Sequence, residues 1–269
     1  MRVARFADGD DPRFGVVGAE DGPQGESVET LAVLKGDPLY AGFELTGQKI
    51  PLADVRLLAP VIPRSKVVCV GKNYAAHALE MAAILGGDGK VPDEPLVFLK
   101  PNTAVIGPGD SIVRPSFTND ISFEGELAIV IGRICKDVPA ADAEKVIFGY
   151  TIANDVSARD LQVKDNQWAR AKGSDTFCPL GPWIETNLDP SNQNITTAVN
   201  GEVLQRGNTG DMTYQVPAII EYISAFTTLL PGDVILTGTP AGVGTLEPGD
   251  DVTVTIDGIG TLRNRVVAG

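Results

Sequence analysis

The chain has 269 residues, which is enough for one large domain or for a large domain with a small one attached. Its formal net charge of −13 argues against nucleic-acid and membrane partners, because such an acidic surface repels phosphate groups. The three cysteines show no CxxC spacing and the first residues contain no apolar signal segment, so we expect a cytoplasmic protein without disulfides.

The N-terminal region indicates short β-strands separated by turns. Residues 1–6 and 14–17 have the length and composition of strands, and a loop rich in glycine and glutamate follows them. Pro60 and Pro63 then interrupt the chain, because proline disfavours both helix and strand pairing. We therefore expect a small N-terminal β domain over residues 1–63 and a larger domain over residues 64–269.

The larger region is also predicted to be mainly β. Its apolar runs of strand length are residues 67–70, 96–99, 126–132 and 147–154. The dipeptide Asn200-Gly201 separates two short apolar segments and predicts a tight hairpin. Pro-Gly-Asp precedes an apolar segment three times and predicts a recurring tight turn, at residues 108–110, 231–233 and 248–250.

Only two segments indicate well-formed helices. Residues 74–85 are rich in alanine and leucine and are followed by two glycines. Residues 216–226 place four apolar side chains on one face, with Pro217 in the first turn. The predicted fold class is therefore mainly β with a few helices, arranged as a mixed β roll or sandwich.

The residues that could carry chemistry are mostly acidic. His77 is the single histidine, which excludes the usual zinc site made of several histidines. The sequence also lacks a GxSxG nucleophile elbow, a Walker loop and a GxGxxG motif after a strand. If a metal ion is present, oxygen ligands must hold it.

Glu124 and Glu126 supply two such ligands. Alternate residues of a strand project to the same face, so these carboxylates can converge on one ion. The apolar run that follows them is plainly buried, and two acids at its mouth are costly unless something neutralises them. The alternative is an exposed strand end with two solvated acids.

Asp155 is the third candidate ligand, because it ends an apolar strand, where functional groups are common. Its alternative role is to cap a following helix. Three carboxylates with room for water suit Mg²⁺ or Mn²⁺ better than a soft metal.

His77 and Glu80 are three residues apart on a predicted helix and can share a face. A carboxylate that orients an imidazole gives a general base, although a surface pair is the alternative.

Lys172 and Lys100 could each bring positive charge to an anionic substrate or be ordinary surface lysines. Gly238 and Thr239 belong to a glycine-rich loop that could grip a carboxylate or be a plain turn.

Six segments that carry these residues occur in one order along about three quarters of the chain. They are Gly71–Tyr74 with His77 and Glu80, Phe98–Pro101, Phe123–Leu127, Asn154–Asp160, Ala171–Gly173 and Leu236–Pro240. In this order the segments resemble the fumarylacetoacetate hydrolase family. Each segment is a weak signal alone, but six in sequence are hard to obtain by chance.

The resemblance implies a mixed β-sandwich roll with a small N-terminal β domain, and a homodimer. It implies that Mg²⁺ or Mn²⁺ is held by Glu124, Glu126 and Asp155. It also implies that His77 and Glu80 form a general-base pair on a segment that orders over the substrate. Lys172 would stabilise a developing enolate or oxyanion, and substrate contacts would come from Thr239, with Arg159 and Gln162 as weaker candidates.

The expected activity is metal-dependent C–C cleavage of small 2-oxo acids, by acylpyruvate or fumarylpyruvate hydrolysis or by oxaloacetate decarboxylation. Isomerisation of 2-hydroxyhepta-2,4-diene-1,7-dioate is the alternative, because one fold and metal site serve all these reactions. The His77–Glu80 pair favours water activation and hence hydrolysis. The insertion at residues 86–90 is expected to shape a mobile lid over the substrate.

Two rivals come from other classes. One is a non-catalytic protein that keeps the fold and binds a ligand, against which the intact acids and His77 argue. The other is a thiol enzyme that pairs Cys69 with His77. Cys69 lies in an apolar strand, where a thiol is expected to be inert.

Overall fold

The computed structural model describes residues 1–9, 11–21, 26–86 and 88–269. The strands are β1 (Arg2–Asp8), β2 (Asp11–Asp21), β3 (Ser27–Leu34), β4 (Leu45–Pro51), β5 (Arg56–Leu58), β6 (Val67–Gly71), β7 (Leu96–Lys100), β8 (Val105–Ile106), β9 (Ser111–Arg114), β10 (Ile121–Phe123), β11 (Gly125–Ile131), β12 (Ile147–Asn154), β13 (Ser157–Ala158), β14 (Cys178–Glu185), β15 (Asn194–Val199), β16 (Glu202–Asn208), β17 (Val234–Leu236), β18 (Gly244–Leu246), β19 (Asp251–Ile256) and β20 (Gly260–Ala268). The helices are α1 (Pro38–Ala41), α2 (Ala75–Leu85), α3 (Arg159–Lys164), α4 (Ala169–Gly173) and α5 (Val216–Phe226), with 3₁₀ turns η1 (Leu52–Asp54), η2 (Asn102–Ala104), η3 (Ala140–Val146) and η4 (Thr209–Asp211).

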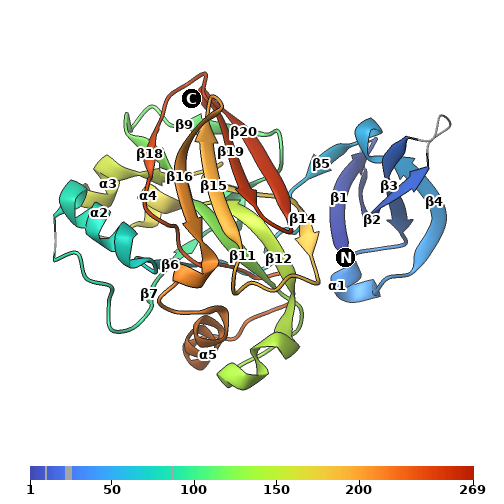
Figure 1. Cartoon of the computed structure of the whole chain (residues 1–269), viewed down its shortest axis with the longest axis horizontal. Helices are drawn as coiled ribbons and strands as arrows, with labels where there is room; N and C mark the ends of the chain where they lie inside the picture. The colour runs from blue at the N-terminus through green and yellow to red at the C-terminus, as the bar shows by residue number, and fades with distance from the viewer. Residues whose placement is uncertain (10, 22–25, 87) are drawn as a thin grey trace.

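The described strands form three sheets (Figure 1). The largest has 12 strands, with the main order β4-β3-β2-β1-β14-β12-β11-β17-β6-β7. A five-stranded sheet of order β16-β15-β19-β20-β9 packs against it, and a small sheet joins β13, β10 and β18. The expected mixed β fold with few helices is therefore confirmed.

The strands β1 to β5 form a lobe at one end of the molecule, on the right of Figure 1. This lobe has an apolar cluster of its own that includes Phe6 and Leu31. It joins the rest of the sheet through a two-residue pairing of β1 with β14. We therefore propose the division into residues 1–63 and 64–269. Part of the glycine- and glutamate-rich loop, residues 22–25, lies outside the described residues.

The central strand β11 is buried on both faces, as its uninterrupted apolar run predicts. Leu127 and Ile129 face a core shared with α5 and the five-stranded sheet. Ala128 and Val130 face a second core on the opposite side of the large sheet. Packing on both faces therefore positions the strand that carries Glu126 at its N-terminal end.

The predicted turns and helices are confirmed at the residue level. Asn200 and Gly201 have φ angles of 53° and 83°, as a tight hairpin between β15 and β16 requires. Each Pro-Gly-Asp turn repeats one arrangement, in which the aspartate carboxylate accepts a hydrogen bond from the backbone N–H three residues earlier. Helix α5 spans the predicted residues and buries the predicted face.

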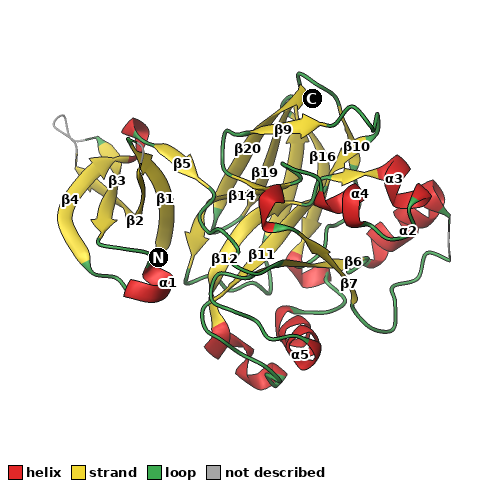
Figure 2. Cartoon of the chain, turned by 180° about the vertical axis from the view of Figure 1, so that it is seen from behind, coloured by secondary structure: helices red, strands yellow, loops and turns green. Residues whose placement is uncertain are grey.

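The helix expected soon after Asp155 is α3, whereas α4 was not predicted, because a segment of five residues is too short to show a helical period. They lie with α2 at the end of the molecule opposite the N-terminal lobe (Figure 2). Among the described residues, no helix has both the length and the apolar character needed to cross a bilayer.

Candidate active site

The strand register brings Glu124 and Asp155 together. In the antiparallel pair of β11 and β12, Gly125 lies opposite Asn154, so the residues just outside these two positions are neighbours. The backbone N–H of Asp155 donates to the carbonyl oxygen of Glu124 at 2.8 Å. The Asn154 side chain accepts from the Glu124 N–H at 2.9 Å and fixes the same corner.

Glu126 points to the same side as Glu124, as the strand alternation predicts. One carboxylate oxygen from each of Glu124, Glu126 and Asp155 lies within 4.8 Å of the others. The exposed fractions of the two glutamates are 4% and 2%, so the alternative of solvated acids at a strand end is wrong. The N-cap of α3 is Ala158, so the alternative of Asp155 as its cap is wrong as well.

Gly125 lies between the two glutamates and faces the five-stranded sheet. A Cβ atom there would lie 2.4 Å from the hydroxyl of Thr197, so only glycine allows the two sheets to approach this closely. The close approach also places Gln205 within hydrogen-bonding distance of the Gly125 backbone.

Three basic side chains neutralise the acidic cluster. The Lys172 ammonium bridges Glu124 Oε2 at 2.6 Å and Asp155 Oδ2 at 2.7 Å. Lys100 contacts Asp155 Oδ1 at 2.6 Å, and Arg159 Nη2 contacts Glu124 Oε1 at 2.6 Å. All three are at most 5% exposed, so the alternative of ordinary surface lysines is wrong.

The pKa values of Glu124 and Glu126 are shifted in opposite directions. Burial alone would raise the pKa of Glu124, but the Lys172 ammonium and the Arg159 guanidinium outweigh it and hold the pKa below its usual range. Burial raises the pKa of Glu126, and the negative charges of Asp155 and Glu124 raise it further. Glu126 has no ion pair among the described residues and accepts a hydrogen bond from Gly238 N at 2.6 Å instead.

The acidic cluster fits a hard divalent cation. Its ligand atoms are all carboxylate oxygens, which magnesium and manganese prefer over the ligands of soft metals. Lys100, Arg159 and Lys172 form ion pairs with Asp155 and Glu124, but none of them pairs with the buried Glu126. A cation between Glu124, Glu126 and Asp155 would compensate the Glu126 carboxylate directly.

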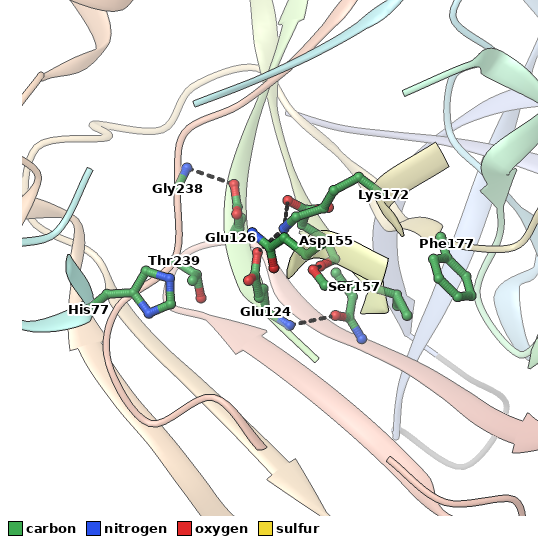
Figure 3. Close-up of polar contacts among 12 residues, drawn as sticks. His77, Glu124, Glu126, Asp155, Ser157, Lys172, Phe177, Gly238 and Thr239 are labelled. Carbon is green, nitrogen blue, oxygen red and sulfur yellow. Dashed lines mark hydrogen bonds and ion pairs between the residues drawn. The ribbon is translucent and has the colours of Figure 1, made fainter. Parts of the chain in front are cut away.

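His77 lies on α2 and faces the acids from the other side of the site. Its Nδ1 is 3.1 Å from Glu80 Oε2, and the second carboxylate oxygen of Glu80 accepts from Gly242 N at 2.9 Å. His77 is 5% exposed, so this is a held pair and not a loose surface contact. Figure 3 shows His77 and Thr239 on one side of the acids and Lys172 on the other.

Thr239 is tied to the glutamate strand. Its hydroxyl donates to Gly125 O at 2.9 Å and accepts from Gln205 Nε2 at 2.8 Å. Gly238 before it has a φ of 99°, and a Cβ there would lie 2.8 Å from the Asn73 side chain. Glycine therefore lets the loop turn against Asn73 while its amide reaches Glu126.

These groups surround a cavity of about 360 Å³, a size suited to a small ligand. Polar lining comes from the acidic cluster with Lys72, His77, Arg159, Gln162, Asn166, Lys172 and Thr239. Apolar lining comes from Val70, Met81, Phe98, Val163 and Trp168. Gln162 accepts from Arg159 Nη1 at 3.0 Å, so both of these weaker candidates belong to the same wall.

Two predicted substrate contacts have other partners in the structure. Lys100 stays outside the described lining, because its ammonium contacts Asp155 and donates to the carbonyl oxygens of Val156, Lys172 and Phe177. The Gly238 amide grips a carboxylate as expected, but the carboxylate is that of Glu126. Both residues therefore contact the acids, and neither is among the residues that line the described cavity.

Sequence reasoning missed several residues that shape the site. Gln205 orients Thr239 from a separate strand, and no local motif marks it. Lys72 belongs to the segment Gly71–Tyr74, but the sequence predicts no role for it. Its φ of 55° and that of Asn166, 57°, are unusual for side-chain-bearing residues that line a cavity.

The fold and the site define a class of enzyme in which a buried carboxylate triad, able to hold a metal ion, faces a histidine–glutamate pair across a small cavity. The family described as fumarylacetoacetate (FAA) hydrolase C-terminal matches residues 66–267. The chain therefore belongs to the fumarylacetoacetate hydrolase family. Residues 1–60 match a second family, described as Rv2993c-like, N-terminal, which supports the proposed domain division.

Three relatives indicate the range of activities nearby. The structure of 5-carboxymethyl-2-hydroxymuconate delta-isomerase from Mycobacterium smegmatis shares 52% identity over the whole of both chains, with a TM-score of 0.89. The human mitochondrial oxaloacetate tautomerase FAHD2A is 44% identical over 81% of this chain and 71% of its own length. Maleylpyruvate hydrolase from Sphingobium sp. SYK-6, solved with manganese (II) and pyruvate, is 33% identical over the whole of both chains, with a TM-score of 0.79.

Proposed function

We propose that this chain is a metal-dependent enzyme that enolises small 2-oxo acids, with Mg²⁺ or Mn²⁺ held by Glu124, Glu126 and Asp155. The observation that carries this proposal is the placement of the carboxylate triad opposite His77 in one cavity. A metal site and a base on opposite sides of a small ligand are what proton removal next to a carbonyl requires. The manganese in the Sphingobium relative supports the choice of ion.

The bound ion, Lys172 and His77 would each have a different role, which follows from its position in the site. When bound, the ion would polarise the 2-oxo carbonyl and favour the enolate by several kcal/mol. The Lys172 ammonium, fixed between Glu124 and Asp155, adds positive charge beside the same oxygen. His77 gives its Nδ1–H to Glu80, which leaves the Nε2 lone pair to take a proton.

C–C cleavage is the first outcome that we propose for this chemistry. His77 Nε2 would take a proton from water, the resulting hydroxide would attack the distal carbonyl, and the bond to the enolate carbon would break. Protonation of that carbon then releases a 2-oxo acid such as pyruvate. In oxaloacetate decarboxylation, CO₂ leaves and the same enolate is protonated. The hydrolase named among the relatives supports this outcome.

Isomerisation or tautomerisation is the second outcome. Here His77 removes a proton from the carbon beside the 2-oxo group and the proton returns at another atom, so no water is consumed. The isomerase and the tautomerase among the relatives favour this outcome, and their identities of 52% and 44% exceed that of the hydrolase. Both outcomes share the enolisation step, which is the central proposal.

Product analysis separates the two outcomes. Metal-stripped protein is supplied with acetylpyruvate, fumarylpyruvate or oxaloacetate before and after addition of Mg²⁺ or Mn²⁺. Metal-dependent release of pyruvate supports C–C cleavage. Metal-dependent interconversion of the keto and enol forms of oxaloacetate, without pyruvate release, supports the second outcome. The homodimer implied by the family resemblance is also proposed, and light scattering tests it.

A further inference from the structure

Lys72 differs from the other basic residues that line the cavity. Arg159 and Lys172 both contact Glu124, so their charges are already compensated. Lys72 makes no ion pair with any described residue, although it is one of the residues that line the same cavity. It therefore offers a positive charge that the described part of the protein does not use.

The backbone at Lys72 has an unusual conformation that is supported by hydrogen bonds of the next residue. Lys72 follows β6 directly and has a φ of 55°, which is uncommon for a residue with a side chain. The next residue, Asn73, donates through Nδ2 to Tyr214 O at 3.0 Å and to Thr237 O at 2.7 Å, and accepts from Tyr214 N at 2.7 Å. Hydrogen bonds next to Lys72 thus support the unusual backbone conformation of this residue.

The strand order places this lysine at a distance from the metal-site acids. Strand β17 lies between β11, which carries Glu126, and β6, which leads to Lys72. Two strand spacings separate their backbones by about 10 Å. The Gly238 loop spans this gap, because its amide contacts Glu126 and its Cα lies against β6 and Asn73. A ligand held at the acids must therefore extend before it reaches Lys72.

Apolar side chains also line the cavity. Val70 and Met81 are among them, and Phe98 packs edge-on against Trp168. Such side chains suit the carbon chain of a small ligand. The cavity therefore combines acids that fit a cation, apolar lining, and a lysine that has no ion pair among the described residues.

We propose that Lys72 binds a second carboxylate of the substrate, so that the site selects 2-oxo dicarboxylates over 2-oxo monocarboxylates. The inference rests on the proposed function, which places the first carboxylate and the 2-oxo oxygen at the triad. The Lys72 ammonium donates a charge-assisted hydrogen bond to the distal carboxylate. Because Lys72 is partly exposed, the gain is moderate, about five- to tenfold in affinity.

A binding experiment with a matched pair of ligands tests this assignment. Calorimetry measures the affinity of the Mg²⁺-loaded protein for 2-oxoglutarate and for 2-oxovalerate, which share a 2-oxo acid head and chain length and differ in the distal carboxylate. Oxalate serves as a probe of the head site alone. The variants are Lys72→Met, Lys72→Arg as the charge-conserving rescue, and Lys164→Met as the control, a lysine on α3 outside the described lining.

We expect the wild type to prefer 2-oxoglutarate by about five- to tenfold and Lys72→Met to abolish the preference without weakening oxalate binding. Lys72→Arg and Lys164→Met should retain the preference. Equal affinities in the wild type, or an unchanged preference in Lys72→Met, would overturn the role of Lys72 alone. Failure of all three ligands to bind in a metal-dependent way would reject the proposed function, and this inference with it.

Discussion

Glu80 and Gly242 are joined by a hydrogen bond from the Gly242 amide to Glu80 Oε1 at 2.9 Å, while Oε2 of the same carboxylate contacts His77. Burial raises the pKa of Glu80, but the hydrogen bonds from His77 and Gly242 outweigh it and hold the pKa below its usual value. The Thr239 loop thus anchors the helix that carries His77. His77, the proposed base, is therefore positioned from two elements that are far apart in the sequence.

The first prediction concerns this base. Replacing His77 with alanine should lower turnover by at least about 10²-fold, because the general base is lost, while Mg²⁺ affinity stays unchanged. Glu80→Gln should also lower turnover, because an amide oxygen that accepts from Gly242 leaves the amide NH₂ facing His77 Nδ1, which favours the tautomer with its proton on Nε2. Steady-state kinetics and calorimetry on the same preparations measure both quantities. Full activity of His77→Ala would remove this residue from the mechanism.

The second prediction concerns the carboxylate triad. Glu126→Gln should lose most of its affinity for Mg²⁺ and Mn²⁺, because it removes a charged ligand that has no basic partner among the described residues. The fold should persist, since a glutamine oxygen can still accept from Gly238. Calorimetry measures the affinity and circular dichroism checks the fold, with Glu80→Gln as a control acid outside the triad. Unchanged metal affinity in Glu126→Gln would contradict the assignment.

The third prediction concerns Lys172. In metal-free protein, Lys172→Met should lower the free energy of unfolding by about 3–5 kcal/mol, because Glu124 and Asp155 lose a buried partner. Saturating Mg²⁺ should restore part of this loss by binding the folded state. Arg170→Met is the matched control on the same helix, because its ion pair with Asp165 is on the surface and its loss should change the free energy of unfolding much less. Chemical denaturation measures the free energy of unfolding of each variant. An equal loss in Lys172→Met and Arg170→Met would show that Lys172 does not stabilise the cluster.

The fourth prediction concerns the cysteines and the rival thiol mechanism. Burial raises the pKa of Cys178 to about 12 and that of Cys69 well above its ordinary value. At pH 9 the native Cys178 thiol is therefore only about one part in a thousand ionised, and iodoacetamide should label it slowly unless the protein unfolds. Below about pH 8.5 the thiols stay protonated in both the folded and the unfolded state, so their contribution to the free energy of unfolding is fully present. As the pH rises further, the unfolded thiols lose their protons first, and the free energy of unfolding falls. Rapid labelling of the native protein with loss of activity would revive the thiol mechanism.

Much of the candidate site could be predicted because it follows from local rules. The alternation of Glu124 and Glu126 and the spacing of His77 and Glu80 depend only on strand and helix periods. The pairing of Glu124 with Asp155 depends on the register of β11 against β12. That register is set by tertiary packing, so the sequence alone could indicate Asp155 but not its contact.

The parts that could not be predicted depend on long-range geometry. The ammonium of Lys100 turns inward to Asp155 and three carbonyl oxygens, and nothing in its local sequence distinguishes this from a ligand-facing lysine. Gln205 reaches Thr239 only because the two sheets pack closely at Gly125. The lid expected at residues 86–90 stays a prediction, because Gly87 lies outside the described residues.

Hydrogen exchange at the carbon beside the 2-oxo group tests the central claim most directly, because every outcome considered above passes through the enolate. Metal-stripped protein is incubated with pyruvate and with oxaloacetate in D₂O, and nuclear magnetic resonance follows deuterium entry at carbon 3. We predict that Mg²⁺ or Mn²⁺ accelerates exchange in the wild type but not in Glu126→Gln or His77→Ala. Exchange that is independent of the metal, or no exchange in protein that binds the metal, would contradict the account.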